Sequence, residues 1–192
     1  MKAHFSFFAV AAFCTVFLSA CSGGELEQSL VNIRAEYLKA DVSLTADVRA
    51  DYGDRCYDYT LSYTGDGNTG TVKVIAPEII DDISAKISES GSFVLSCGDT
   101  LIDTGEICAT GYSPLETLPI IVSAIRTGYA ENIYGEGLDG EDCIVAEINI
   151  SGAGEREKTI CTLWFSDENH DLIKAEIAVN GFTVLSAKFR EV

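Results

Sequence analysis

The sequence is poor in several residue types that catalysis and metal binding depend on. Its 192 residues include two histidines, one methionine, one tryptophan and three prolines. The seven cysteines form no Cys-x-x-Cys pair, and no Gly-x-Ser-x-Gly segment is present. A catalytic triad would have to use His170, because the other histidine, His4, lies in the N-terminal segment considered below. These absences argue against a hydrolase and against a zinc site.

Basic residues are also scarce. The chain has 13 Lys and Arg against 30 Asp and Glu, which gives a net charge of −17. A surface this acidic repels nucleic acids and anionic lipid headgroups, so nucleic-acid binding is excluded as a function. The apolar fraction of 47% is too high for a disordered acidic chain.

The N-terminus has the parts of a secretory signal. A basic start at Lys2 is followed by an apolar run over residues 5–17 and then by small residues that end at Cys21. The run is short for a membrane span. The segment is therefore interpreted as a signal that is removed; the alternatives are an ordinary signal peptide that happens to carry a cysteine, and a short transmembrane helix.

The segment Leu18-Ser19-Ala20-Cys21 closely resembles the lipobox of bacterial lipoproteins. The resemblance implies that residues 1–20 are removed and that Cys21 receives a thioether diacylglycerol. Residues 21–24 would form a lipidated, flexible tether, and residues 25–192 a single domain. The mature chain would keep 12 basic and 30 acidic residues, a net charge of −18. Acyl chains, at about 0.8 kcal/mol per buried methylene, would then hold it at the extracytoplasmic face of the cell membrane.

Five cysteines remain for the folded domain: Cys56, Cys97, Cys108, Cys143 and Cys161. Outside the cytoplasm, one or two disulfides can form among them. The count is odd, however, and cysteine is also a common small apolar residue of buried strands. Both interpretations stay open from the sequence.

Residues 25–39 are predicted to form the first helix, because Leu26, Leu30, Ile33 and Tyr37 make one apolar stripe. From residue 41 onward the apolar residues recur at every second position, which is typical of half-buried strands. Strands are predicted over residues 41–51, 57–63, 71–76, 83–87, 93–97, 100–104, 106–109, 131–135, 142–150, 159–166, 172–179 and 182–190. Asn180-Gly181 predicts a type I′ hairpin turn.

A helical insertion interrupts the strands. Ser113, Pro114 and Glu116 match a capping box with proline at the first helical position. Apolar residues then keep helical spacing at Leu115, Leu118, Val122, Ile125 and Tyr129. Pro119 predicts either a kink or a short first turn with the main helix restarting at Pro119. Gly128 is the predicted C-cap.

The predicted fold class is α+β, with a single curled antiparallel sheet of about 10–11 strands. Such a sheet would form a half-open barrel, and the helices would cover its concave face. The residues predicted to line the cavity beneath the helices are Leu44, Val48, Tyr57, Tyr59, Leu61, Tyr63, Phe93, Leu95, Leu118, Val122, Ile125, Ile148 and Trp164. In this architecture core and pocket wall share one face, so the tyrosines and Trp164 could equally be packed core residues.

This order of elements is similar to the bacterial lipoprotein-carrier superfamily of the LolA and LolB type. The resemblance rests on the lipobox, the first helix, the insertion 113–119, the strand 162–165 with its Trp-Phe pair, and the turn 167–171 that precedes Leu172-Ile173-Lys174-Ala175. It implies an acyl chain held under a helical lid. The chain departs from the soluble carriers by its own anchor, and by having no arginine on the sheet interior, since Arg49 and Arg55 lie near strand ends or on polar faces.

The expected function is a non-enzymatic lipoprotein without a cofactor that binds a lipid or acyl chain. The alternative is a scaffold that binds a cell-envelope protein, as spore-germination relatives do. An open apolar cavity would favour the carrier, and a filled interior would favour the scaffold. His170 is expected in an exposed turn. The acidic segments 81–82 and 136–142 could bind calcium, but are better explained as solvated loops.

Overall fold

Eleven antiparallel strands form one sheet in the part of the chain that the computed structural model describes, residues 22–39, 41–66, 68–88, 92–106, 112–151 and 157–190. The elements, in order, are α2 (Ser22–Tyr37), β1 (Val42–Asp51), β2 (Cys56–Gly65), β3 (Gly70–Ala76), η1 (Glu78–Ile80), β4 (Ile83–Ile87), β5 (Ser92–Cys97), β6 (Thr100–Glu106), η2 (Pro114–Glu116), α3 (Thr117–Thr127), β7 (Tyr129–Leu138), β8 (Glu141–Asn149), β9 (Thr159–Ser166), β10 (Leu172–Val179) and β11 (Phe182–Phe189). The predicted 106–109 segment lies mostly outside the described residues.

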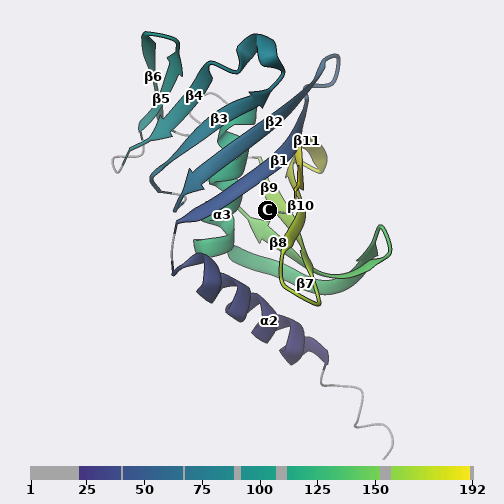
Figure 1. Ribbon diagram of the computed structural model, residues 1–192. Coiled ribbons are helices and arrows are strands. Elements are labelled where there is room, and N and C mark those ends of the chain that lie inside the picture. Colours follow the sequence, from purple (N-terminus) through teal and green to yellow (C-terminus); the bar gives the residue numbers. More distant parts are fainter. Residues whose placement is uncertain are drawn as a thin grey trace, which may run out of the picture.

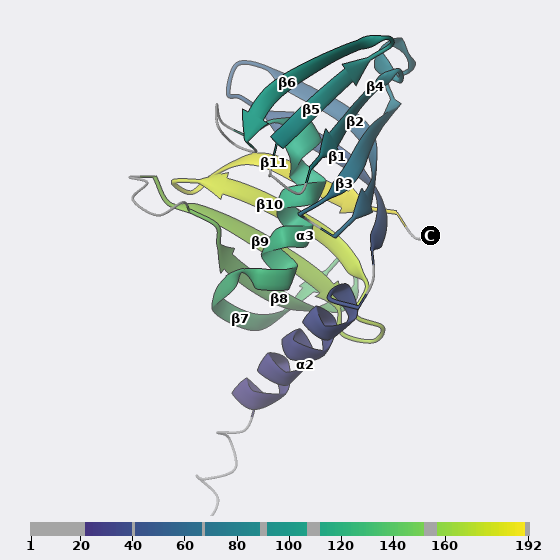
Figure 2. The same ribbon diagram turned by 90° about the vertical axis from the view of Figure 1, so that its left-hand side faces the viewer.

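The strand order places the first and last strands side by side in the middle of the sheet. From β1 the chain steps outward to β6, and from β7 it steps back inward to β11, which pairs with β1. The two edges are β6 and β7, so the sheet is open. The connection between these edges carries η2 and α3, which therefore cross the inner face of the sheet (Figures 1 and 2).

The predicted strands other than 106–109 are confirmed, whereas Glu106, predicted to begin a separate strand, is the last residue of β6. Alternation between apolar and polar residues is strong in most of the strands. The facing residues Ala46, Val48 and Ala50 of β1 are buried, while Asp47 and Arg49 between them are exposed. The hairpin turn between β10 and β11 is also confirmed. Asn180 and Gly181 have φ values of 51° and 84°, the two positive values that a type I′ turn requires.

The inner face of the sheet and α3 form the hydrophobic core. Eight of the eleven residues of α3 are buried, and six of them pack with inner-face residues of both halves of the sheet. The apolar residues of α3 face the sheet, which curves around the helix (Figure 2), while Ser123, Arg126 and Thr127 are not buried. The core residues on the strands include Leu61, Val72, Ala85, Phe93, Ala146, Ile148, Leu163, Phe165, Ala175, Ile177, Leu185 and Ala187.

The start of the insertion follows the second of the two predicted forms. The capping box between Ser113 and Glu116 is present, and it begins the short 3₁₀ turn η2. The main helix restarts at Thr117, two residues before Pro119. Pro119 is tolerated there because the first-turn N–H groups of a helix have no partner within the helix.

Tyr129 was predicted on the stripe of this helix, and this assignment is wrong. Gly128 follows α3 with an extended backbone, at φ −67° and ψ 148°, and Tyr129 is the first residue of β7. The apolar period therefore ends at Ile125.

The first helix confirms its predicted stripe but starts earlier. Leu30 and Ile33 are buried, and Leu26 and Tyr37 are half-buried. The helix begins at Ser22, so the segment 22–24 is helical and is not the predicted flexible tether. The strong helix formers from Glu25 onward extend the helix back through this glycine-containing turn. Within the described residues, neither helix is long and apolar enough to cross a membrane.

Candidate functional site

The thirteen residues predicted to line the cavity separate into three groups. Eight are packed in the core between α3 and the sheet: Val48, Leu61, Tyr63, Phe93, Leu118, Val122, Ile125 and Ile148. Leu44, Tyr59 and Leu95 are half-buried against the same core. The structure therefore brings eleven of the thirteen together in one apolar core between α3 and the sheet. Tyr57 and Trp164 are the two that do not belong to it.

The interior beneath α3 is filled in this conformation. Leu61, Leu118, Val122, Ile125 and Ile148 each have 0% of their surface exposed, and the other three residues of the first group have 2% or less. A side chain without accessible surface cannot line a space that holds a water molecule, still less an acyl chain. These eight residues form packed core here.

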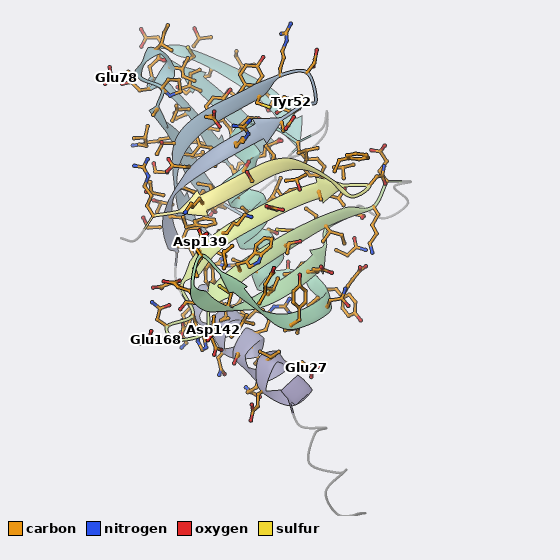
Figure 3. All side chains as sticks on the ribbon, turned by 90° about the vertical axis from the view of Figure 1, so that its right-hand side faces the viewer. Glu27, Tyr52, Glu78, Asp139, Asp142 and Glu168 are labelled. Atoms are coloured by element: carbon orange, nitrogen blue, oxygen red, sulfur yellow. The ribbon has the colours of Figure 1, made fainter. Side chains whose placement is uncertain are left out.

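Tyr57 belongs to a group of tyrosines at one open end of the inner face. It is 41% exposed, and the centroid of its ring lies 6.3 Å from that of Tyr52. The Tyr52 hydroxyl donates to the carbonyl oxygen of Tyr112, just before η2, at 3.2 Å. The end of the β1–β2 hairpin, where Figure 3 labels Tyr52, is thus joined to the start of the insertion by this hydrogen bond.

Trp164 was predicted to line the cavity, and the structure corrects this. Its neighbours across the strands are Val145 and Lys174, and it packs with Cys143 and Val145 in a second cluster on the outer face of the sheet. Its indole N–H donates to Glu136 at 3.0 Å, and the Lys174 ammonium lies 4.8 Å from its ring centroid.

The end of the β7–β8 hairpin lies over this outer cluster. Leu138 packs against it, and Asp139 at the hairpin turn pairs with Lys188 of β11 at 3.4 Å (Figure 3). The two strands that separate β8 from β11 in the sheet, β9 and β10, carry Trp164 and Ile173 of the cluster. The hairpin thus covers this part of the outer face, and the apolar side chains of the cluster lie beneath it.

Two arginines of the helices make contacts that the sequence analysis missed. Arg34 of α2 donates to the carbonyl oxygen of Gly128, the residue after α3. Arg126 of α3 donates to the carbonyl oxygen of Asp66, after β2. The sequence predicted no arginine on the sheet interior, and these two arginines lie on the helices instead. The available signal was that each helix has one basic residue in its last turn, where a cation is favoured by the helix dipole.

Both contacts lie at the C-terminal end of α3, and the pKa values of the groups around them are shifted. Burial lowers the pKa of the Arg34 guanidinium. The pKa of Asp66 is lowered mainly by the backbone N–H of Thr69, which donates to its carboxylate at 2.6 Å, and further by Asn68 and by the charge of Arg126. On α2, burial, with the charges of Asp171 and Glu36, raises the pKa of Tyr37 to about 12.

The four described cysteines are free thiols. Cys56 and Cys97 are exposed, whereas Cys143 and Cys161 are buried. Burial raises the pKa of Cys161 to about 12, so this thiol is unreactive in the closed structure. A disulfide among these four is thereby ruled out for this structure. Cys108 and the predicted lipid site Cys21 lie outside the described residues.

Residues considered for catalysis or metal binding do not come together. His170 lies in the predicted turn between β9 and β10, with a φ of 65°, but it is half-buried and not exposed as predicted. Among the described residues, no group of three or more His, Cys, Asp or Glu side chains is arranged to hold a metal ion. The chemistry available on the inner face is apolar contact.

An open antiparallel sheet with its first and last strands paired, and with a helix crossing between its edges, defines a class of fold. Solved structures share it. A domain proposed to be an outer-membrane lipoprotein-sorting protein from Vibrio parahaemolyticus is 12% identical, with a TM-score of 0.50 over 86% of this chain and 92% of its own. At this identity the likeness shows the fold alone, and the predicted LolA-like fold is confirmed at that level.

Two further structures are similar to the chain. A LolA superfamily protein from Nitrosomonas europaea is 11% identical, with a TM-score of 0.43 over 85% of this chain and 91% of its own. A DUF1329 family protein from Desulfovibrio piger is 9% identical, with a TM-score of 0.49 over 88% and 91%. No protein-family model and no curated protein matches the sequence.

Proposed function

We propose that the protein is an extracytoplasmic lipoprotein, anchored to the cell membrane through Cys21, that takes up a lipid or acyl chain beneath α2. The observation that carries the proposal is the manner in which α2 is docked. Among its described side chains, Leu30 and Ile33 are the buried apolar ones, and they join the cluster that contains Ile125 of α3 and Ile148 of β8. The helix contacts β7, β8 and α3.

The energetics support α2 as the element that moves. Undocking it would expose two buried aliphatic side chains, each worth about 1.5–3 kcal/mol, and also the half-buried Tyr37. Burial of roughly four to eight methylene groups of an acyl chain, at about 0.8 kcal/mol each, would offset the aliphatic part of this loss, and further methylene groups would offset the rest. Displacing α3 would instead expose eight buried residues. The acyl chain would therefore contact Ile125 and Ile148, and the half-open barrel of the sheet would provide the rest of the wall.

The position of α2 in the chain fits this role. The helix starts at Ser22, the residue after the proposed lipid site. Membrane attachment would hold α2 next to the bilayer, so a lipid would have a short path from the membrane to the apolar face. The domain assignment that follows is a removed leader, residues 1–20, and a folded domain from 22 onward.

A second candidate function is a scaffold for a cell-envelope protein. The filled interior beneath α3 favours it, because eight of the predicted lining residues already have their contacts satisfied within the chain. In this case the core would be structural, and a partner would bind to the outer surface.

The two candidates are separated by a lipid-uptake experiment on the mature protein with Cys21→Ser, which lacks the anchor. The probe is a fluorescent long-chain fatty acid, measured by fluorescence titration and native mass spectrometry. We expect saturable binding of one probe, with faster uptake by Arg34→Ala, which loosens α2. The matched control Val31→Ala alters an exposed side chain of the same helix and should behave as wild type.

Absence of binding to both wild type and a folded Arg34→Ala protein would overturn the carrier proposal. Recovery of a stoichiometric envelope protein from solubilised membranes, using the lipid-free protein, would then support the scaffold.

A further inference from the structure

The two edges of the sheet differ in what lies beside them. The edge strand β7 contacts α2. The other edge strand, β6, pairs with β5 and with no other described strand. Thr100 to Thr104 are all exposed. Figure 1 shows the β5–β6 hairpin at the end of the sheet away from α2. An uncovered edge presents backbone N–H and C=O groups that can pair with a further strand.

Some of the usual protections of an edge strand are missing from β6. The strand Thr100–Glu106 contains no proline, lysine or arginine; its charged residues are Asp103 and Glu106, and its pairing with β5 shifts register between Ser92 and Val94. Leu101 and Ile102 are 71% and 51% exposed and lie on opposite faces, since Ile102 is paired with the inner-face residue Leu95 and Leu101 with Ser96. A strand added at this edge would cover apolar surface on both faces.

The register also shows which backbone groups are available. Gly98 and Asp99 form a two-residue turn, and Cys97 and Thr100 are the pair that closes it. In such a hairpin every second residue of β6 directs its N–H and C=O groups toward β5, and the residues between direct theirs away from it. Leu101 and Asp103 are therefore expected to turn their N–H and C=O groups toward the open edge.

The negative charge around this edge favours a basic partner. The segment 75–106, which includes β4, β5 and β6, has seven acidic residues and one basic residue, Lys86. Asp99 and Asp103 are exposed on the β5–β6 hairpin, and Asp82 lies 3.7 Å from the Cys97 thiol next to its turn. A second copy of this chain would bring the same negative charge to the edge and be repelled.

We propose that β6 binds an extended, basic segment of a partner protein as an additional strand. The segment alternates lysine or arginine with aliphatic residues, so that its cations face Asp103 and its aliphatic side chains face Ile102. Backbone pairing provides the affinity, and the acidic edge provides the preference for a basic segment. The inference goes beyond acyl-chain binding and does not depend on it.

The experiment uses the mature Cys21→Ser protein without added lipid and a synthetic peptide in which lysine alternates with valine. Binding is measured by titration, and the site by slowed amide hydrogen exchange in β6. Leu101→Pro removes one outward N–H at a position where an edge strand tolerates proline, and should weaken binding about tenfold or more. Asp103→Lys should weaken it about fivefold, whereas the matched change Glu168→Lys on a distant turn should have an effect below about twofold.

Three results would overturn the proposal. The first is equal binding of a peptide with the same charge and a central proline, which would indicate attraction by charge alone. The second is unchanged binding to Leu101→Pro, with a native spectrum for that variant. The third is a wild-type dimer in sedimentation that Leu101→Pro converts to a monomer, which would make a second copy the occupant. Since no lipid is present, failure here leaves the carrier proposal intact.

Discussion

The two helices both pack on the inner face of the sheet, but they relate to it differently. In α3, eight of eleven residues are buried, and the helix crosses between the two halves of the sheet. In the longer α2, with sixteen residues, Leu30 and Ile33 are the buried side chains among those described. The comparison teaches that α3 is part of the core, while α2 contributes few buried side chains to it, as the proposed movement of α2 requires. A lid function assigned to both helices would therefore be too broad.

The largest effect is expected from truncating the core helix. Ile121→Ala removes a fully buried side chain of α3 and should lower the free energy of unfolding by about 2–5 kcal/mol, because the rigid surroundings cannot close the space. Urea denaturation followed by circular dichroism measures this change. A loss below about 1 kcal/mol would contradict the assignment of α3 to the core.

A smaller and local effect is expected from Arg34→Ala. The variant removes the donor to the Gly128 carbonyl oxygen and should cost about 1–2 kcal/mol in the docking of α2. Amide exchange in residues 22–37 should become faster while exchange in β8 stays slow. Alkylation of the buried Cys161 thiol, located by peptide mapping in a protein whose exposed Cys56 and Cys97 and whose Cys108 are replaced by serine, reports whether the interior opens at the same time. Equal acceleration in α2 and β8 would indicate global unfolding instead.

Asp66, which contacts Arg126 at the C-terminal end of α3, provides a pH-dependent test. The pKa of Asp66 is lowered in the folded state, chiefly by the Thr69 N–H, so the folded protein holds the proton less tightly than the unfolded chain. This contribution is present above about pH 4 and is lost as the pH falls through the lowered value. Asp66→Asn should cost about 1 kcal/mol at neutral pH and less in acid. Asp99→Asn, in another hairpin turn, is the control. If the stability difference between wild type and Asp66→Asn did not change with pH, the lowered pKa of Asp66 would not be its cause.

The smallest effect is expected on the outer side of α2. Val31 is 56% exposed, so Val31→Ala should change the free energy of unfolding by less than about 0.5 kcal/mol. A larger loss, measured by the same urea denaturation, would mean that α2 packs more extensively than its burial indicates, and would remove the contrast with α3.

Local signals in the sequence predicted much of this fold. Alternating residues such as Ala46, Val48 and Ala50 indicated strands, Asn180-Gly181 indicated the hairpin turn, and Ser113 with Glu116 indicated the start of the insertion. Each of these depends on neighbours within a few residues, where backbone geometry limits the choices.

The missed features depend on contacts between distant segments. Arg34 and Gly128 are 94 residues apart, and no spacing rule connects them. In β9 both faces are apolar, because Trp164 alternates with Leu163 and Phe165. Alternation assigns these residues to two faces of the sheet but does not say which of the two faces α3. That becomes known only from the β7–β8 hairpin, which covers the face with Trp164 and makes it the outer one. The predicted cavity failed at Trp164 for this reason.

The outer position of Trp164 has a practical consequence for spectroscopy. It is the single tryptophan of the chain, and it sits beneath the β7–β8 hairpin with Glu136 and Lys174 as polar neighbours. Its fluorescence therefore reports on the ordering of that hairpin and on global unfolding. Movement of α2, or occupation of the inner face, would leave the emission spectrum of Trp164 nearly unchanged. An unchanged tryptophan emission during a ligand titration therefore does not show that the ligand is unbound.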